Sequence, residues 1–260
     1  MPLQSFTGAT ALPQAGPLGY HHDMNIHDVN IAKSGHWTET LPEPLPLDPL
    51  EVAADWLKQA TLDASQPNPN AMVLATVDAS GQPSARVVLC KGIDAANGYI
   101  RFFTNYKSRK GGELAANGRA AVVFHWDHRH RQVRAEGRVE PTSDAENDEY
   151  FRSRPWQSRL GAWASQQSQP VDSRATLVAA VTAQARRFDI PYAGPGSTEP
   201  DAVSVIIPRP AHWGGFRLHV SAIELWVEGE FRIHDRARWL RASPDTEGST
   251  LRWSVTRLQP

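Results

Sequence analysis

Three side chains that can carry positive charge recur at alternate positions near the end of the chain, in the run Arg232-Ile233-His234-Asp235-Arg236. We predict that this run lies on a β-strand, where a period of two places Arg232, His234 and Arg236 on one side. Cations aligned in this way repel one another, and an anion bound between them would offset the repulsion. Trp226 precedes the run by a short turn and can pack against a flat ring. The run therefore predicts a site for an anionic ligand.

A second candidate group is Ser108-Arg109-Lys110, which stands where a predicted strand and turn lead into a helix. Free backbone N–H groups and the helix dipole favour a phosphate at such a position. Arginine adds bidentate donors, and lysine adds a point charge. Many helix starts carry these residue types without a ligand, so an ordinary helix start is the alternative interpretation here.

Tyr150, Arg154 and Ser158 recur at a spacing of four, which on a continuous helix would place them on one face. Pro155 interrupts that helix, so we expect the three side chains to converge around a bend. A guanidinium, a phenol and a hydroxyl together suit a phosphate monoester. Three polar residues on a helix surface are the alternative.

Arg86 and Lys91 bracket a predicted strand at an odd separation. They should lie on opposite faces of a regular strand, unless a bulge intervenes. On this segment alone, two ordinary edge charges are the favoured interpretation. Between them, Cys90 has no evident catalytic partner and is predicted to be a small core residue.

The composition is that of a chain that can bury a core and carries almost no net charge. Of 260 residues, 40% are hydrophobic and 21% are charged, and the formal net charge is −1. General binders of nucleic acid or anionic membranes usually need a basic excess, so we predict neither partner. No apolar run approaches the ~20 residues that span a bilayer, and no signal-peptide pattern begins the chain. With Cys90 as the one cysteine, we expect a soluble, cytoplasmic protein.

No metal site is predicted. Histidines gather at positions 21–27 and 125–130. No carboxylate or cysteine framework accompanies the first group, and Arg129 and Arg131 interleave the second.

Many short strands with a few inserted helices must position the candidate residues. We interpret residues 1–47 as a flexible N-terminal arm and residues 48–260 as a single domain. The local patterns predict helices starting at Asp48-Pro49, Ser108, Ser143 and Pro155, and a further one over 172–188 with Leu177, Val178 and Val181 facing inward. They predict strands at 71–77, 84–91, 99–104, 120–126, 132–139, 216–227, 231–236 and 251–258. Residues 189–212 are rich in Pro and Gly and are interpreted as a loop or insertion. The fold class predicted is mainly β with flanking helices, an antiparallel barrel.

The ordered motifs resemble those of the pyridoxamine 5′-phosphate oxidase family, the FMN enzymes that produce pyridoxal 5′-phosphate. The resemblance runs from about Leu47 to Pro260. It is carried by SARVVLCK at 84–91, FFTN at 102–105 with SRK at 108–110, RQV at 131–133, YFRSRP at 150–155, GAWASQQS at 161–168, WGGFR at 213–217 and RIHDR at 232–236. Phe103 stands where a Tyr is common, and residues 1–47 do not match the family's pattern of an Arg and a Tyr that often close over the substrate.

This resemblance implies an FMN-binding split β-barrel with Greek-key-like antiparallel topology, a homodimer with two FMN sites at the subunit interface. It implies that the cofactor is bound by Arg86, Val87, Val88, Leu89, Cys90, Lys91, Phe103, Thr104, Ser108, Arg109, Lys110, Gln132, Gln167, Ser168, Trp226 and Arg236. It implies that the substrate is bound by Lys91, Tyr150, Arg154, Ser158, Arg232 and His234. Of these, Arg232 and His234 are implied to be catalytic, by positioning the pyridine ring beside the flavin.

The implied reaction moves a hydride from C4′ of pyridoxamine or pyridoxine 5′-phosphate to flavin N5. Dioxygen then reoxidises the flavin, which releases hydrogen peroxide, and the amine substrate also releases ammonia. One alternative is a related split-barrel flavin oxidase of the phenazine-biosynthesis type, with another aromatic substrate. The other is a protein that binds FMN or pyridoxal phosphate without catalysis.

Overall fold

The structure is a computed structural model that describes residues 39–192, 206–241 and 253–260. Most of the predicted N-terminal arm, residues 1–38, lies outside them. The last part of that arm contacts the barrel: Leu41 is buried in the core, and its backbone N–H donates to Asp235. Farther on, the Pro46 carbonyl accepts a hydrogen bond from Trp239.

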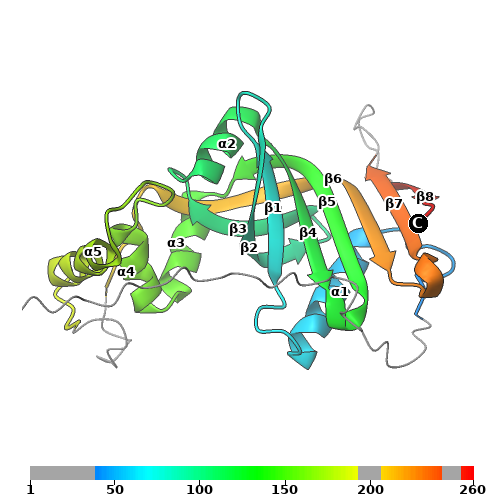
Figure 1. Ribbon diagram of the computed structural model, residues 1–260, viewed down its shortest axis with the longest axis horizontal. Coiled ribbons are helices and arrows are strands. Elements are labelled where there is room, and N and C mark those ends of the chain that lie inside the picture. Colours follow the sequence, from blue (N-terminus) through cyan, green and yellow to red (C-terminus); the bar gives the residue numbers. More distant parts are fainter. Residues whose placement is uncertain (1–38, 193–205, 242–252) are drawn as a thin grey trace, which may run out of the picture. The chain divides into compact units, whose positions relative to one another are not determined.

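In the described part of the chain, eight antiparallel strands form one sheet in the order β3-β2-β1-β4-β5-β6-β7-β8 (Figure 1). A further pairing between β3 and β6 closes six of them into a barrel, which confirms the predicted mainly-β antiparallel barrel with flanking helices. The strands are β1 (Ala71–Val77), β2 (Pro83–Asp94), β3 (Tyr99–Asn105), β4 (Arg119–Trp126), β5 (Arg131–Pro141), β6 (Trp213–Val227), β7 (Asp235–Arg241) and β8 (Trp253–Arg257).

Strand β6 is longer than its neighbours, and along one edge it pairs with two different strands in succession. Its first half pairs with β3 from Trp213 to His219, and this pairing closes the barrel. Its second half pairs with β7 from Ala222 to Val227, so β7 and β8 extend the sheet beyond the barrel. Local sequence patterns do not predict that β6 pairs with two strands along one edge, because these partners lie far away along the chain.

Alternating apolar residues form the barrel core. In β1, Met72, Leu74 and Thr76 are buried while the residues between them are less so, which is the period expected of a strand with one inner face. The turn from β1 to β2 is held by Asp78, whose side chain accepts hydrogen bonds from the backbone of Ser80 and Gln82. The predicted hairpin is therefore confirmed.

Helix α1 (Pro49–Asp63) begins as predicted, with Asp48 as N-cap and proline at its first position. The Asp48 carboxylate accepts from the Leu50 N–H, which satisfies one of the free donors of the first turn. Leu50, Ala53 and Ala60 are fully buried against the barrel core.

Helices α3 (Asp144–Ser153), α4 (Trp156–Ala164) and α5 (Arg174–Arg187) enclose a second apolar cluster beside the barrel. The predicted capping box of α3 is present, with reciprocal bonds between Ser143 and Glu146. The prediction for α5 was wrong at Leu177, which is exposed. This helix reaches the cluster through Val181 and Ala185 in its C-terminal half, whereas Leu177 and the half-buried Val178 are not part of that cluster.

The predicted strand over residues 231–236 was wrong in its first half. Residues Glu230–Arg232 form a short 3-10 turn, and Phe231 and Arg232 both have positive φ, at 53° and 65°. The turn is tight: a Cβ on Gly229 would lie 1.7 Å from the Ile233 carbonyl oxygen. Strand β7 therefore begins only at Asp235, and Arg232 does not share a strand face with Arg236.

The described parts of residues 189–212 contain no helix or strand, in agreement with the predicted loop. Residues 193–205 of that segment, and 251–252 of the predicted last strand, lie outside the described residues.

Candidate active site

A pocket of about 660 Å³ opens beside the barrel between β2, β3 and helices α2 (Arg109–Asn117), α3 and α4. Its volume is in the range of small-molecule sites. It brings together most of the predicted site residues, namely Arg86, Val87, Val88, Leu89, Lys91, Phe103, Thr104, Lys110, Tyr150, Arg154, Ser158 and Gln167. A second cavity of about 670 Å³, formed by α2 and the adjoining ends of β4 and β5, is lined by none of them.

Lys110 lies at one end of this pocket with only neutral acceptors around its ammonium. Its Nζ donates to Gln167 Oε1 at 2.7 Å, to Thr104 Oγ1 at 3.2 Å and to Ser108 Oγ at 3.4 Å. The residue is 9% exposed. Burial, and then the nearby Arg86 charge, lower the pKa of Lys110. A buried cation without a carboxylate in contact is the arrangement expected where an anion binds.

Ser108 caps the helix that carries Lys110, as predicted. Its hydroxyl accepts from the Gly111 N–H and donates to the Asn105 carbonyl, so the strand end and the helix start are joined through one side chain. The predicted phosphate group Ser108-Arg109-Lys110 thus lies at a true helix N-terminus beside the pocket, although Ser108 and Arg109 do not line it.

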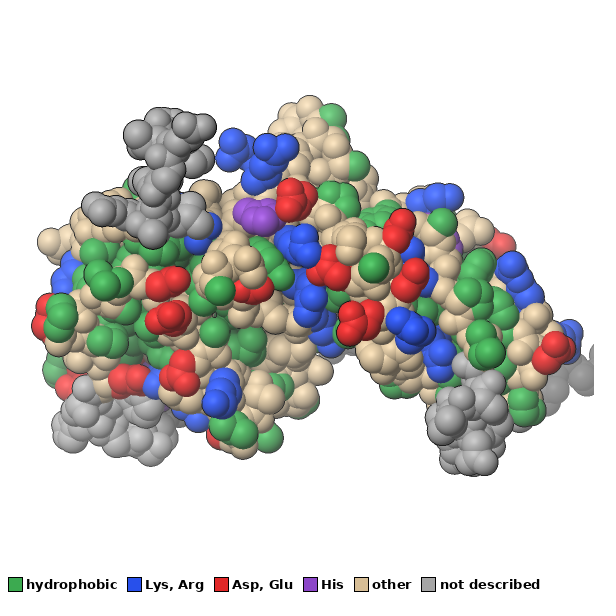
Figure 2. All heavy atoms as spheres, turned by 180° about the vertical axis from the view of Figure 1, so that it is seen from behind, with side chains coloured by type: hydrophobic (Ala, Val, Ile, Leu, Met, Phe, Trp, Pro, Cys, Tyr) green, Lys and Arg blue, Asp and Glu red, His purple; other side chains and the backbone are tan. Residues whose placement is uncertain are grey.

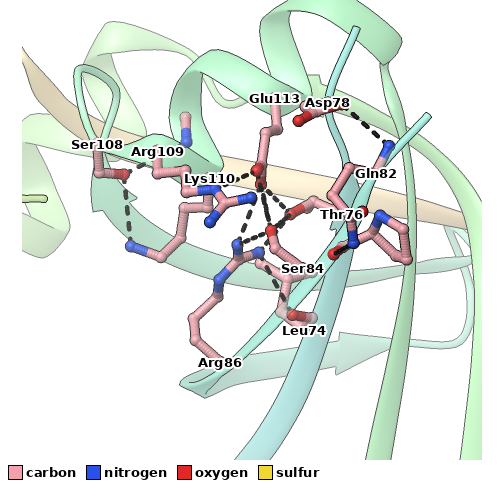
Figure 3. Close-up of polar contacts among 12 residues, drawn as sticks. Leu74, Thr76, Asp78, Gln82, Ser84, Arg86, Ser108, Arg109, Lys110 and Glu113 are labelled. Carbon is pink, nitrogen blue, oxygen red and sulfur yellow. Dashed lines mark hydrogen bonds and ion pairs between the residues drawn. The ribbon is translucent and has the colours of Figure 1, made fainter. Parts of the chain in front are cut away.

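A buried carboxylate, Glu113, joins the two arginines next to this end of the pocket (Figure 3). It accepts from Arg86 Nη2 at 3.0 Å and from Arg109 Nε at 2.8 Å. Thr76 and Ser84 donate their hydroxyls to the same carboxylate. Burial alone would raise the pKa of Glu113, but these four donors outweigh it and hold the pKa at about 2.

Arg86 and Lys91 both line the pocket despite their odd separation. The pairing of β2 with β3 shifts register between Cys90 and Ile93, and Gly92 in this interval has a φ of 147°. The β-bulge that would allow Arg86 and Lys91 to share one side of the strand is therefore present. Cys90 faces the core instead, and burial raises the pKa of its thiol to about 11.

Three aromatic rings form a stack on the pocket wall. The Phe103 ring centroid lies 4.1 Å from that of Tyr150 and 5.4 Å from that of Trp213. Lys91 Nζ lies 5.7 Å from the Tyr150 centroid, and the Arg154 guanidinium lies 4.7 Å from the Trp213 centroid. The stack thus carries a cation on either side.

Tyr150, Arg154 and Ser158 converge on this pocket as predicted. Helix α3 ends at Ser153, Arg154 is its C-cap, and α4 starts at Trp156, so the bend at Pro155 turns the three side chains toward one space. Arg154 Nη1 is buried and has no hydrogen-bond partner among the described residues. Burial lowers the pKa of Arg154, and an unused buried donor of this kind calls for an acceptor.

The remaining predicted residues form a separate group where β5, β6 and β7 meet, which we call the β6–β7 patch: Gln132, Trp226, Arg232, His234 and Arg236. Trp226 is paired in register with Gln132 on one side and Arg236 on the other. The His234 ring lies 4.7 Å from that of Trp226, and its Nδ1 accepts from the Gly229 N–H at 3.1 Å. Arg236 is paired with the buried Glu224 at 2.9 Å, and Arg232 is exposed.

No residue of the β6–β7 patch lines the pocket. The pocket contacts Trp213 at the start of β6, whereas the patch centres on Trp226 near its end. Thirteen residue steps of extended strand correspond to a path of roughly 40 Å. Within one chain, the structure therefore separates the predicted residues into two groups. Of the others, Ser168 lies outside the pocket with a positive φ of 72°, next to Gln167 inside it.

Among the residues that sequence reasoning missed at this site, Trp213 lines the pocket and Glu113 lies next to it. Trp213 lies within a motif that was recognised, but its contact with Phe103 and Arg154 depends on the tertiary fold. Glu113 could have been found, because it follows Arg109 by four residues on a predicted helix, the spacing of a helical ion pair.

Replacing Gly111 by alanine is expected to destabilise the protein by about 1–3 kcal/mol. A Cβ at this position would lie 2.2 Å from the Tyr106 carbonyl oxygen, so the first turn of α2 would have to move. Urea denaturation measures the change. The control is Gly112→Ala on the same turn, where a Cβ meets nothing within 4 Å and helix propensity should make alanine neutral or stabilising. Equal behaviour of the two variants would contradict the close packing described here.

Acidic and basic side chains alternate on the face shown in Figure 2. Ion pairs between described residues include Arg217 with Glu146 and Arg209 with Asp148. This face presents no single-sign field of the kind that attracts a polyanion. Among the described residues, no helix has the length and apolar character needed to cross a bilayer.

Comparison with known proteins gives matches over most of the chain. Residues 59–187 match the family described as pyridoxamine 5′-phosphate oxidase, and residues 213–260 match the pyridoxine 5′-phosphate oxidase C-terminal dimerisation region. A pyridoxine/pyridoxamine 5′-phosphate oxidase of Burkholderia mallei (strain SAVP1) is 50% identical over 205 residues, covering 79% of this chain and 86% of the relative. The corresponding protein of Burkholderia cenocepacia (strain HI2424) is 47% identical over 214 residues, covering 82% and 89%.

Two solved structures share the fold. PhzG from Burkholderia lata 383, in complex with tetrahydrophenazine-1-carboxylic acid, superposes with a TM-score of 0.72 at 28% identity, covering 87% of this chain and all of that one. A pyridoxamine 5′-phosphate oxidase-related, FMN binding protein from Nostoc punctiforme PCC 73102 gives a TM-score of 0.59 at 15% identity, covering 83% of this chain and all of that one. The second likeness concerns the fold alone.

Proposed function

The chain belongs to the pyridoxamine 5′-phosphate oxidase family, and from this premise we propose that it uses FMN and dioxygen to convert pyridoxamine 5′-phosphate, pyridoxine 5′-phosphate or both to pyridoxal 5′-phosphate. The family is one of oxidoreductases, and the relatives at 50% and 47% identity carry the name of this activity. The observation that carries the proposal is the pocket itself, which offers two separate cationic positions, one at Arg86 and Lys110 and one at Arg154.

The first cationic position fits the phosphate of FMN. Lys110 is a buried ammonium whose partners are all neutral, and Arg86 lines the same end of the pocket. Gln167 and Thr104 hold the ammonium in place. The exposed edge of β2, from Val87 to Leu89, lines the pocket beside them and offers apolar surface to a flat ring.

The second position fits the phosphate of the substrate. Arg154 has a buried Nη1 without a partner, and Ser158 and Tyr150 line the pocket beside it. A guanidinium with a free donor and two hydroxyls are the groups that recognise a phosphate monoester. Lys91 lies over the Tyr150 ring and adds a further cation to the pocket.

When bound, FMN supplies the redox chemistry, accepting a hydride and passing electrons to dioxygen. The chain's own residues bind and orient the substrate, so that the reacting carbon is held in place. His234 accepts at Nδ1 from the Gly229 N–H, which leaves Nε2 as the ring nitrogen that can donate a hydrogen bond to the substrate ring or its substituents. We propose that Arg232 likewise donates hydrogen bonds that orient the substrate.

We further propose that each active site combines the pocket of one protomer with the β6–β7 patch of its partner. The matched dimerisation region, residues 213–260, contains Trp226, Arg232, His234 and Arg236. Within one chain the pocket and the patch lie at opposite ends of β6. A two-fold dimer can bring the patch of one copy to the pocket of the other, which supports a homodimer with FMN at its interface.

The proposed domain comprises residues 48–260, preceded by an arm, 1–47, whose end rests on the barrel through Leu41 and Pro46. We infer a cytoplasmic location from the chain's one cysteine, which is buried as a free thiol.

A second candidate function is oxidation of a phenazine precursor, favoured by the TM-score of 0.72 to PhzG. That protein's ligand carries a carboxylate and no phosphate, according to its description as tetrahydrophenazine-1-carboxylic acid. The pocket of this chain retains Tyr150, Arg154 and Ser158 around a free guanidinium donor, which favours a phosphate ester.

Turnover of pyridoxamine 5′-phosphate tests the proposed function directly. We expect the purified protein to show a flavin absorption spectrum and to release hydrogen peroxide and pyridoxal 5′-phosphate in equal amounts. Unphosphorylated pyridoxamine should react at least about 100-fold less efficiently, because the charged contacts to phosphate are lost. Turnover of tetrahydrophenazine-1-carboxylic acid in its place would establish the second candidate, and bound flavin without turnover of either would leave a binding protein.

A further inference from the structure

We propose that Glu113 is a positioning residue, which fixes Arg86 and Arg109 for recognition of the FMN phosphate. This inference rests on the proposed function, since it takes FMN as the ligand of the pocket. Glu113 is absent from the residues that the family resemblance implies, and it does not itself line the pocket.

The Glu113 carboxylate is shared between the two arginines, one on each oxygen. Oε2 accepts from Arg86 Nη2 at 3.0 Å, and Oε1 accepts from Arg109 Nε at 2.8 Å. The hydroxyls of Ser84 and Thr76 donate to the same group, and both also accept from Arg86 (Figure 3). Glu113, which is fixed on α2, therefore holds each arginine on one side of its guanidinium group.

Arg86 donates through both Nη atoms and Arg109 through Nε, which leaves Nε of Arg86 and both Nη atoms of Arg109 for a ligand. No described residue accepts from Arg86 Nε or from either Nη of Arg109. Arg109 is exposed to 57% at its side chain, so without Glu113 it would occupy many conformations. Fixing a long side chain before binding reduces the entropy lost when the anion arrives.

Glu113 also adjusts the charge of this end of the pocket. Arg86, Arg109 and Lys110 carry three positive charges, and the Glu113 carboxylate leaves two, which matches a phosphate dianion. The carboxylate is 4% exposed, and burying such a group is costly unless it is fully hydrogen-bonded. Of its four donors, Arg86 lines the pocket and Arg109 precedes Lys110, which lines it too, so the carboxylate is tied to the anion site through these two arginines.

Replacing Glu113 by glutamine tests the assignment, because the amide keeps the shape but its NH₂ cannot accept from an arginine. Binding of FMN and of riboflavin, which lacks the phosphate, is measured by flavin fluorescence on the apo-protein. We expect the Kd for FMN to rise about 10- to 100-fold, and the Kd for riboflavin to change less than about twofold. Glu113→Asp keeps the charge and should recover part of the FMN affinity.

Asp63→Asn is the matched control, because it makes the same acid-to-amide change in an arginine pair, with Arg129, that does not touch the pocket. It should leave both Kd values unchanged. Thr76→Val, which removes one donor to Glu113 and one acceptor from Arg86, gives a milder version if Glu113→Gln does not fold. It should also weaken FMN more than riboflavin.

The outcomes separate this inference from the proposed function. Tighter FMN binding in Glu113→Gln would show that the carboxylate competes with phosphate, and equal losses for FMN and riboflavin would show a purely structural role. Either result overturns the inference. If the wild-type protein itself does not prefer FMN to riboflavin, the proposed function fails first.

Discussion

Replacing Lys110 by methionine is expected to give a folded protein that is purified without flavin. Lys110 is 9% exposed, and its Nζ contacts only the neutral oxygens of Gln167, Thr104 and Ser108. Methionine fills a similar volume and removes a buried charge that no carboxylate contacts. We therefore expect the thermal stability of the apo-protein to be unchanged or raised, while FMN affinity falls at least about 100-fold.

FMN affinity should fall while the stability of the apo-protein stays the same or rises, so a general loss of folding cannot explain the expected result. The flavin-to-protein absorbance ratio, the Kd for FMN and the melting temperature of the apo-protein are the measurements. Lys107→Met, three residues earlier and exposed outside the pocket, is the control and should retain flavin. A Lys110→Met protein that keeps its flavin would contradict the assignment of the phosphate to this end of the pocket.

Mixing two inactive variants is expected to restore activity. Arg154 lies in the pocket and Arg232 in the β6–β7 patch. Each of Arg154→Ala and Arg232→Ala should lower kcat/KM at least about 100-fold as a homodimer, with flavin retained. In a dimer with one copy of each, one active site contains both substitutions and the other contains neither. Co-expression with two different affinity tags isolates this dimer, which should have about half the wild-type activity per dimer.

The control is a dimer of Arg154→Ala with Lys91→Ala, in which both substitutions fall in the pocket. Each of its sites contains one altered pocket, so it should stay inactive. Lack of recovery in the Arg154→Ala and Arg232→Ala dimer would mean that the pocket and the patch do not meet across the subunit interface.

Local signals in the sequence were sufficient for most of the elements that carry the site. The N-caps Asp48, Ser108 and Ser143 were predicted from the local pattern of residue types, because a side-chain acceptor at a helix start satisfies free backbone donors of the first turn. The pocket group of Tyr150, Arg154 and Ser158 followed in the same way from Pro155 and the spacing of four.

The errors lie where packing that the residue pattern does not show overrides a local period. Residues 231–236 alternate like a strand, but the close approach of Gly229 to the Ile233 carbonyl forces a turn with positive φ at Phe231 and Arg232. Leu177 has helical spacing with Val181, but α5 meets its neighbours only farther along. The first hypothesis also took Arg232, His234 and Arg236 as cations without a carboxylate partner, but the buried Glu224 pairs with Arg236.

The inward orientation of Cys90 has a consequence for an enzyme that would make hydrogen peroxide. Its neighbours Leu89 and Lys91 line the pocket, while its own sulfur is buried and has a pKa of about 11. Peroxide attacks the thiolate, and at pH 8 only about one thiol in a thousand would be ionised. If the proposed reaction takes place in this pocket, the chain's one cysteine lies one residue from the source of oxidant, and its burial keeps the thiol protonated and out of reach of peroxide.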